Sequence, residues 1–213
     1  MQRLQYVRAI CGYWKQNKSW TILALVGLLS WWTWQPQLAR SAASDETTDT
    51  QIVAAWHGAS FPVEDFLDYT SPFGYRRSGS SSEFHAGLDL AAPEGSYIRS
   101  WWAGQVVEVI DDGRCGVGLV IQSGNWEHIY CHMSGTSETR DGQRYFVDRA
   151  GGIIIAQGQA IPTAARIGRV GMTGRTTGPH LHWGLRFDDE WVDPALVLRA
   201  MYEEQSYSLN PKN

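Results

Sequence analysis

The stretch Gln105-Val-Val-Glu-Val-Ile110 is the first of three short apolar runs that decide the fold. The second and third runs are Val117-Gly-Leu-Val-Ile-Gln122 and Trp126-Glu-His-Ile-Tyr-Cys-His132. Asp111-Asp-Gly-Arg114 and Ser123-Gly-Asn125 lie between them and are rich in turn-forming residues. Apolar alternation bounded by Gly, Asp and Asn predicts a three-stranded antiparallel meander.

Short β-like runs continue on the C-terminal side of this meander, at residues 152–156, 166–170, 181–187 and 191–192. Asp193-Pro194 then combines a preferred N-cap residue with proline at the first helical position, which predicts a short helix over 194–200. We therefore expect a mostly β fold with an antiparallel sheet core and few short helices. The predicted domain covers residues 61–200, and residues 201–213 are a C-terminal tail.

The N-terminal segment differs in composition from the rest of the chain. Residues 1–43 contain five basic residues and no acidic residue, and an apolar run extends from Trp20 to Trp34. Fifteen apolar residues suit the hydrophobic region of a signal peptide, although flanking tryptophans also suit an uncleaved membrane anchor. Either interpretation implies membrane attachment or export through residues 20–34. The polar, acidic stretch that follows predicts a linker over 44–60.

The charge balance excludes some classes of partner. Residues 44–213 contain 13 basic and 22 acidic residues, a net charge of −9. An acidic body argues against binding nucleic acid as the main task. Nothing in the sequence identifies a protein partner.

Cys115 and Cys131 are the two cysteines outside the N-terminal segment. If the second and third strands of the meander pair around Gly124-Asn125, Cys131 lies opposite Gly118, close to Cys115. Export would permit a disulfide there, and we hypothesise a Cys115–Cys131 bond. Two buried free thiols are the alternative.

The histidines of the chain indicate a metal-binding site. His180 and His182 are two residues apart in a predicted strand, so both side chains lie on one face and can reach one metal ion. His85 and Asp89 form a second pair, but four residues of straight strand are too long for two ligands of one ion. The chain must therefore bend at Ala86-Gly87, which places His85 on a loop and Asp89 at the start of a strand.

The third predicted strand offers two further histidines. His128 and His132 share one face with Trp126 and Tyr130, so periodicity alone does not decide which histidine reaches the site. In the same way, spacing does not decide whether His180 or His182 is the ligand.

Joined together, these motifs resemble those of LytM/lysostaphin-type zinc metallopeptidases. The matching segments are His85-x-x-x-Asp89, Tyr130-Cys-His132-Met and Gly174-Arg-Thr-Thr-Gly-Pro-His-Leu-His182. The flanking stretches Phe61-Pro62, Ser71-Pro-Phe-Gly-Tyr-Arg76 and Val192-Asp-Pro194 also resemble the family, so the likeness extends over about 61–198.

The resemblance implies one Zn²⁺ held by His85, Asp89 and His182. It implies His180 as general base and His132 as a second catalytic histidine that stabilises an oxyanion. The implied substrate is the peptide part of peptidoglycan, in particular its cross-links, in the bacterial cell envelope (periplasm or membrane-anchored). Two departures from the family pattern are a long stretch from Ser134 to Ile167, and Trp183-Gly184 where an acidic residue that orients His182 is common.

Three other functions are possible for such a chain. A catalytically silent peptidoglycan-binding or amidase-activating protein of the same fold is the first, and a zinc D-alanyl-D-alanine carboxypeptidase is the second. A purely structural zinc domain is the third, but such sites fill all four positions with protein ligands. Because the chain keeps all five residues of the family's site, we expect a zinc metalloendopeptidase.

Overall fold

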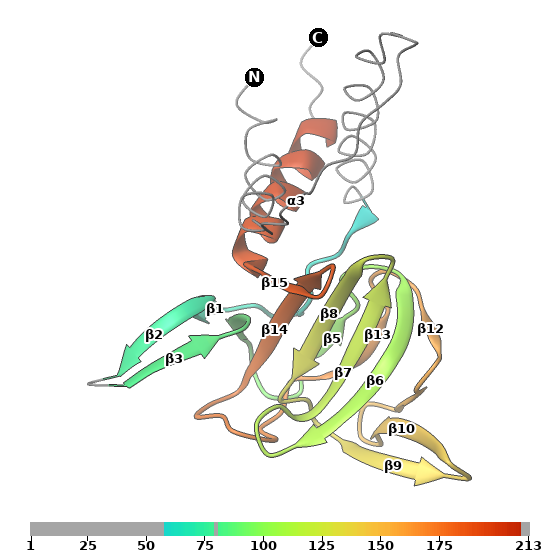
Figure 1. Ribbon diagram of the computed structural model, residues 1–213. Coiled ribbons are helices and arrows are strands. Elements are labelled where there is room, and N and C mark those ends of the chain that lie inside the picture. The colour runs from blue at the N-terminus through green and yellow to red at the C-terminus, as the bar shows by residue number, and fades with distance from the viewer. Residues whose placement is uncertain (1–57, 79–80, 210–213) are drawn as a thin grey trace, which may run out of the picture. The chain divides into compact units, whose positions relative to one another are not determined.

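The computed structural model describes residues 58–78 and 81–209 (Figure 1). The chain divides into two compact units, Met1–Ala54 and Ala55–Asn213, and every described residue belongs to the second. The predicted signal or anchor segment and most of the predicted linker lie outside the described residues. Within the described ranges, no helix has the length and apolar character needed to cross a membrane.

The centre of the described unit is an eight-stranded antiparallel sheet (Figure 1). Its order is β1 (Asp68–Ser71), β4 (Leu88–Ala91), β14 (His180–Phe187), β8 (Trp126–Cys131), β7 (Gly116–Ser123), β6 (Gly104–Asp112) and β12 (Ala160–Ile161), with β15 (Glu190–Val192) paired to β14. Strands β6, β7 and β8 pair consecutively, which confirms the predicted meander.

Smaller sheets surround this centre. They are the hairpin of β2 (Gly74–Ser78) with β3 (Ser81–His85), the pair of β5 (Tyr97–Arg99) with β13 (Arg166–Arg169), and the trio of β9 (Thr136–Arg140), β10 (Gln143–Asp148) and β11 (Ile153–Ala156). The β2–β3 and β9–β10 hairpins project from different sides of the main sheet (Figure 1). The runs predicted at 152–156 and 166–170 correspond to β11 and β13. The long 134–167 stretch folds mainly into the trio.

The two faces of the main sheet differ in polarity. On β14, Leu181, Trp183 and Leu185 are fully buried, whereas His180 and His182 point to the opposite face. This alternation is the period-2 arrangement of a strand. The apolar face packs against Trp101, whose ring contacts the rings of Trp126 and Trp183. The sheet thus has a buried, mostly apolar core face and a polar face that carries His180 and His182.

The one α-helix of the described residues is α3 (Pro194–Leu209). The Asp193 Oδ1 atom accepts a hydrogen bond from the Ala195 backbone N–H at 2.9 Å, so the predicted cap is confirmed. The helix continues past Ala200, where the sequence predicted its end. Buried Val197 and Met201 lie on one side of it, and Gln205 Nε2 donates to the Ala59 carbonyl at 2.8 Å. These tertiary contacts stabilise the helical turns of α3 after Ala200, which local sequence signals do not predict.

Candidate metal centre

Three side chains of the predicted site are brought together by the sheet and by one bend. Asp89 of β4 and His182 of β14 are direct cross-strand partners. His85 is the last residue of β3, so our expectation that it lies on a loop was wrong. The expected bend at Ala86-Gly87 is present and turns the chain from β3 into β4.

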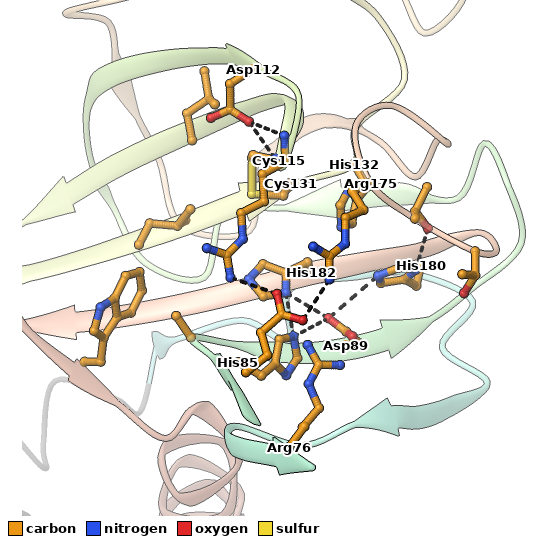
Figure 2. Close-up of a pocket in the computed structure, with 18 residues that line it drawn as sticks. Arg76, His85, Asp89, Asp112, Cys115, Cys131, His132, Arg175, His180 and His182 are labelled. Atoms are coloured by element: carbon orange, nitrogen blue, oxygen red, sulfur yellow. Dashed lines mark hydrogen bonds and ion pairs between the residues drawn. A yellow bond between two sulfur atoms is a disulfide. The ribbon is translucent and has the colours of Figure 1, made fainter. Parts of the chain in front are cut away.

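The ligand atoms of these residues converge on one point (Figure 2). The distances are 3.0 Å from His85 Nε2 to Asp89 Oδ1, 2.8 Å from His182 Nδ1 to Asp89 Oδ1, and 2.9 Å from His85 Nε2 to His182 Nδ1. Two ligands on one tetrahedral zinc ion, at bonds of about 2.0–2.2 Å, are separated by roughly 3.3 Å. The triangle therefore has about the size of a zinc coordination face.

Proton accounting supports a cation at this point. His85 Nδ1 lies 2.7 Å from the Pro72 carbonyl oxygen, which only accepts, so Nδ1 carries the proton of the neutral ring. His85 Nε2 then presents a lone pair to Asp89 Oδ1 and His182 Nδ1. The three contacts among His85 Nε2, Asp89 Oδ1 and His182 Nδ1 can share at most one proton, the one that His182 Nδ1 can carry. Lone pairs this close repel one another unless a cation lies between them, and imidazole nitrogen with carboxylate oxygen is a donor set that zinc accepts.

His182 is positioned by a close approach of the backbone. A Cβ atom added to Gly87 would lie 2.7 Å from His182 Cε1 and Nε2 and 2.8 Å from the Trp183 carbonyl oxygen. Any side chain at residue 87 would therefore displace the ring. The sequence indicates only a bend at Gly87, because the steric requirement depends on a residue 95 positions away.

His180 lies beside this triangle. Its Nδ1 is 2.8 Å from the Gly178 carbonyl oxygen, so the neutral ring carries its proton there. Its Nε2 faces the pocket, 3.7 Å from Asp89 Oδ1. The Thr176 Oγ1 atom, 3.3 Å from Nδ1, also helps to orient the ring. His180 thus directs an unprotonated nitrogen towards the three-ligand cluster.

His132 reaches the same pocket through a change in backbone conformation. Strand alternation would place residue 132 on the core face with Trp126, His128 and Tyr130. His132 instead follows the end of β8 with a φ of 61°, a left-handed conformation that ends the alternation. Its ring centroid lies 4.8 Å from that of His180, and its Nδ1 is 2.9 Å from the Thr173 carbonyl oxygen.

His128 stays on the core face and is fully buried. Its Nδ1 lies 2.9 Å from the Tyr130 hydroxyl and its Nε2 lies 2.7 Å from Ser123 Oγ. Geometry therefore separates the two histidines that the sequence pattern left equivalent.

Burial and hydrogen bonding set the ionisation of the cluster. Burial opposes the charge on Asp89, but the neighbouring imidazoles of His182 and His85 outweigh it and hold the pKa of this carboxyl well below its usual range. Burial lowers the pKa of His182 and of His132. A charged carboxylate beside neutral imidazoles is the protonation state that metal ions require.

These side chains line a pocket of about 400 Å³, which we call the histidine pocket (Figure 2). Its lining includes His85, Asp89, His132, His180 and His182. It also includes four charged residues for which the sequence indicated no site role, Arg76, Glu83, Arg114 and Arg175. These four come from three separate segments. Arg76 and Arg175 lie in stretches quoted for the resemblance, but nothing in those stretches indicates a site role for them.

Cys115 and Cys131 form a disulfide bond, which confirms that hypothesis. The bond links the residue just before β7 to the last residue of β8, beside His132. Both sulfur-bearing residues are buried and line the histidine pocket.

The fold and the three-ligand cluster define a class, the metal-dependent peptidases of the LytM/lysostaphin type. The family model described as peptidase family M23 matches residues 83–194, and the chain belongs to this family. The resemblance inferred from the motifs is thereby confirmed.

Two curated relatives with enzyme names are similar to this chain. The DD-carboxypeptidase/endopeptidase Mpg of Neisseria meningitidis serogroup B is 34% identical over 131 residues, covering 60% of this chain and 26% of that protein. The peptidoglycan DD-endopeptidase ShyA of Vibrio cholerae is 32% identical over 129 residues, covering 59% and 26%. The chain therefore spans about a quarter of the length of these relatives.

Among solved structures, a zinc-containing peptidase from Vibrio cholerae is similar to this chain with a TM-score of 0.50 and 27% identity. The match covers 66% of this chain and 38% of that one.

Proposed function

We propose that this protein is a zinc-dependent endopeptidase that hydrolyses peptide cross-links of bacterial peptidoglycan. One observation carries the proposal: three ligand atoms of His85, Asp89 and His182 converge within 2.8–3.0 Å of one another. Membership of peptidase family M23 and the enzyme names of the relatives support the substrate class.

One zinc ion is proposed to bind His85 Nε2, Asp89 Oδ1 and His182 Nδ1. When bound with three protein ligands and an open position, zinc acidifies water and polarises a carbonyl group. A structural zinc site would need a fourth protein ligand. The ligand group found among the described residues contains three members, which favours catalysis.

His180 is proposed as the general base. Its Nε2 has a free lone pair because the proton of the neutral ring is on Nδ1, which donates a hydrogen bond to the Gly178 carbonyl. A distance of 3.7 Å separates Nε2 from Asp89 Oδ1. This nitrogen accepts a proton from attacking water and later returns it to the leaving amine.

His132 is proposed as the second catalytic histidine. The Thr173 carbonyl accepts a hydrogen bond from Nδ1, so a hydrogen bond to a developing oxyanion must come from Nε2. The ring is neutral in the free protein and can donate that bond only after Nε2 has taken up a proton. Its ring lies beside that of His180 at a centroid distance of 4.8 Å, which allows the two imidazoles to act on one carbonyl group.

The proposed location is the cell envelope, with residues 1–43 as signal peptide or membrane anchor and 44–60 as linker. The disulfide supports an extracytoplasmic site because such bonds persist in oxidising compartments. We assign residues 61–200 to the peptidase domain, and the C-terminal turns of α3 follow it.

The experiment is digestion of purified peptidoglycan with the folded, exported protein, followed by mass analysis of muropeptides. Cross-linked dimers should decrease and monomers should accumulate, chelation should stop this, and added zinc should restore it. A preparation with stoichiometric zinc that leaves every cross-link intact would contradict the proposal.

A carboxypeptidase activity is a second candidate, because the Neisseria relative is named for both activities. The same digestion distinguishes the two. Release of free D-alanine from uncross-linked pentapeptides marks the carboxypeptidase, whereas loss of dimers marks the endopeptidase.

A further inference from the structure

Three arginines line the histidine pocket, although residues 44–213 carry a net charge of −9. Arg76 comes from β2, Arg114 from the turn between β6 and β7, and Arg175 from the loop before β14. Arg76 and Arg175 both extend towards the middle of the pocket (Figure 2). The lining also contains Glu83, Asp89 and Asp112, so carboxylates balance these guanidinium groups in the free protein.

Arg114 and Arg175 lie on two segments that are joined by their backbones. The Arg175 backbone N–H donates to the Arg114 carbonyl at 3.0 Å. A Cβ added to Gly174 would clash with the backbone from Arg114 to Gly116, so the two segments pack without room for a side chain. We call this pair of residues, Arg114 and Arg175, the arginine platform.

The platform is anchored on one side by Asp112 and the disulfide. Asp112 Oδ1 accepts hydrogen bonds of 2.7 Å from the Arg114 and Cys115 backbone N–H groups, so this carboxylate is already engaged with the turn. The Cys115–Cys131 bond then ties the turn to the end of β8.

A carboxylate of the chain itself occupies the platform. Glu83 of β3 places Oε2 2.8 Å from Arg175 Nη2 and Oε1 3.7 Å from Arg114 Nη2. The hydrogen bond and charge of Arg175, with a smaller contribution from Arg114, hold the pKa of Glu83 below its usual range. Glu83 and its cross-strand partner Arg76 belong to the β2–β3 hairpin, so the ion pairs span the pocket from the hairpin to the platform.

These ion pairs are weak enough to be exchanged. The arginine side chains are 71% exposed and that of Glu83 is 44% exposed. Exposed ion pairs contribute little to the stability of a protein because water and salt screen the charges. An incoming carboxylate can therefore replace Glu83 without the cost of breaking a buried pair.

Resting on the proposed function, we propose that Arg114 and Arg175 form a subsite for a free carboxylate of the peptide substrate, and that Glu83 occupies this subsite in the free protein. Binding of the substrate exchanges one carboxylate for another on the same guanidinium groups. Charge-assisted hydrogen bonds of this kind give selectivity for a carboxylate over a carboxamide.

The test compares two cross-linked muropeptide dimers, one with free carboxylates and one with all of them converted to carboxamides. Affinity is measured by calorimetry on the zinc-loaded His180→Ala protein, which is designed not to turn over the peptide. The free-carboxylate dimer should bind about tenfold more tightly. Arg114→Gln and Arg175→Gln should each remove most of this preference while leaving carboxamide affinity unchanged.

Arg77→Gln is the matched control, because Arg77 follows Arg76 on the same strand and faces away from the pocket. It should keep the full preference. Glu83→Gln should increase affinity for the free-carboxylate dimer by about two- to fivefold, the amount expected from removing an exposed ion pair. Dimers with a single carboxamide then distinguish a C-terminal carboxylate from one within the stem.

Equal affinity for both dimers, a preference that survives in the double Arg114→Gln, Arg175→Gln variant, or no measurable binding of either dimer would overturn the subsite. Cleavage by the protein with His180 intact is measured in parallel. If it cleaves without preference, the subsite is wrong and the proposed function stands. If it binds with preference but does not cleave, the proposed function is wrong and the subsite stands.

Discussion

The two faces of β8 and β14 carry histidines in opposite chemical situations. On the core face, His128 has both ring nitrogens engaged, by Tyr130 and Ser123. On the pocket face, His180 has Nδ1 engaged by the Gly178 carbonyl oxygen, and Nε2 points into the pocket. His132 has the same arrangement, with Thr173 as its backbone acceptor.

This difference separates an imidazole that is fully engaged in the core from imidazoles that are available for the proposed chemistry. A ring whose two nitrogens both bond to side-chain hydroxyl groups, as in His128, is held in place and has no nitrogen left for chemistry. A ring with one backbone acceptor has a defined tautomer and one lone pair available. The substitutions below test this comparison, beginning with the largest expected effect.

Asp89→Ala should abolish the metal centre. Asp89 Oδ1 contacts both His85 Nε2 and His182 Nδ1, so its loss removes the charge that holds the cluster together. We expect less than stoichiometric zinc by atomic absorption and a decrease in muropeptide cleavage of at least about a thousandfold. Removing an outer partner of a ligand typically costs only about 10- to 100-fold. A fully zinc-loaded Asp89→Ala protein would contradict the assigned ligand set.

His180→Ala should retain zinc and lose turnover. The residue lies beside the ligand triangle, and removal of a general base costs about 10²- to 10⁴-fold in kcat. Zinc content and kcat, measured on the same preparation, check this expectation. If the variant loses zinc and His182→Ala retains it, the roles of the two histidines are reversed.

Gly87→Ala should weaken zinc binding without unfolding the protein. The added methyl group would overlap the His182 ring, and a misdirected ligand lowers metal affinity by about 10- to 100-fold. Competition with a zinc-binding dye measures this change. Gly113→Ala is the control, because a Cβ there meets no atom within 4 Å. Equal affinities in the two variants would argue against a steric role for Gly87.

His128→Asn should affect stability alone. An asparagine does not span the distance between Tyr130 and Ser123, so we expect a loss of about 1–3 kcal/mol in the free energy of unfolding at pH 7.5. Cleavage by the folded variant should be unchanged. Urea unfolding monitored by tryptophan fluorescence gives the stability.

The pH dependence sharpens this last test. Burial lowers the pKa of His128 from 6.5 to about 3, so below pH 6.5 the unfolded chain binds a proton that the folded protein excludes. Wild-type stability therefore decreases on acidification, by up to about 1.4 kcal/mol per pH unit from this group. The variant lacks this contribution, and the stability gap should narrow by pH 5. A gap that stays constant would mean that His128 titrates normally.

Sequence patterns predicted the parts of this molecule that depend on local signals. Alternation and turn residues located the meander, and Asp193-Pro194 located the start of α3. Pairing of β7 with β8 around Gly124-Asn125, together with expected export, supported the disulfide as a hypothesis beside two buried free thiols, and the structure contains the disulfide. The motifs also identified the three residues that converge, although geometry alone did not rank His182 over His180.

Features that depend on tertiary contacts were not predictable in this way. The left-handed conformation of His132 changes the face on which it lies, and no turn signal in the sequence marks it. Burial of Met201 and the Gln205–Ala59 hydrogen bond extend α3 beyond its local pattern. The arginine platform joins residues 61 positions apart through one backbone hydrogen bond.

The position of His85 at the end of the β2–β3 hairpin has a consequence for folding. A hairpin of two short strands is only marginally stable by itself. His85 makes this hairpin part of the metal centre, so ion binding and hairpin ordering are thermodynamically linked. Slow hydrogen exchange of the β2 and β3 amides should then depend on zinc concentration, whereas the meander should remain protected throughout. The ion would therefore stabilise one wall of the pocket, the β2–β3 hairpin, in addition to its proposed role in the reaction.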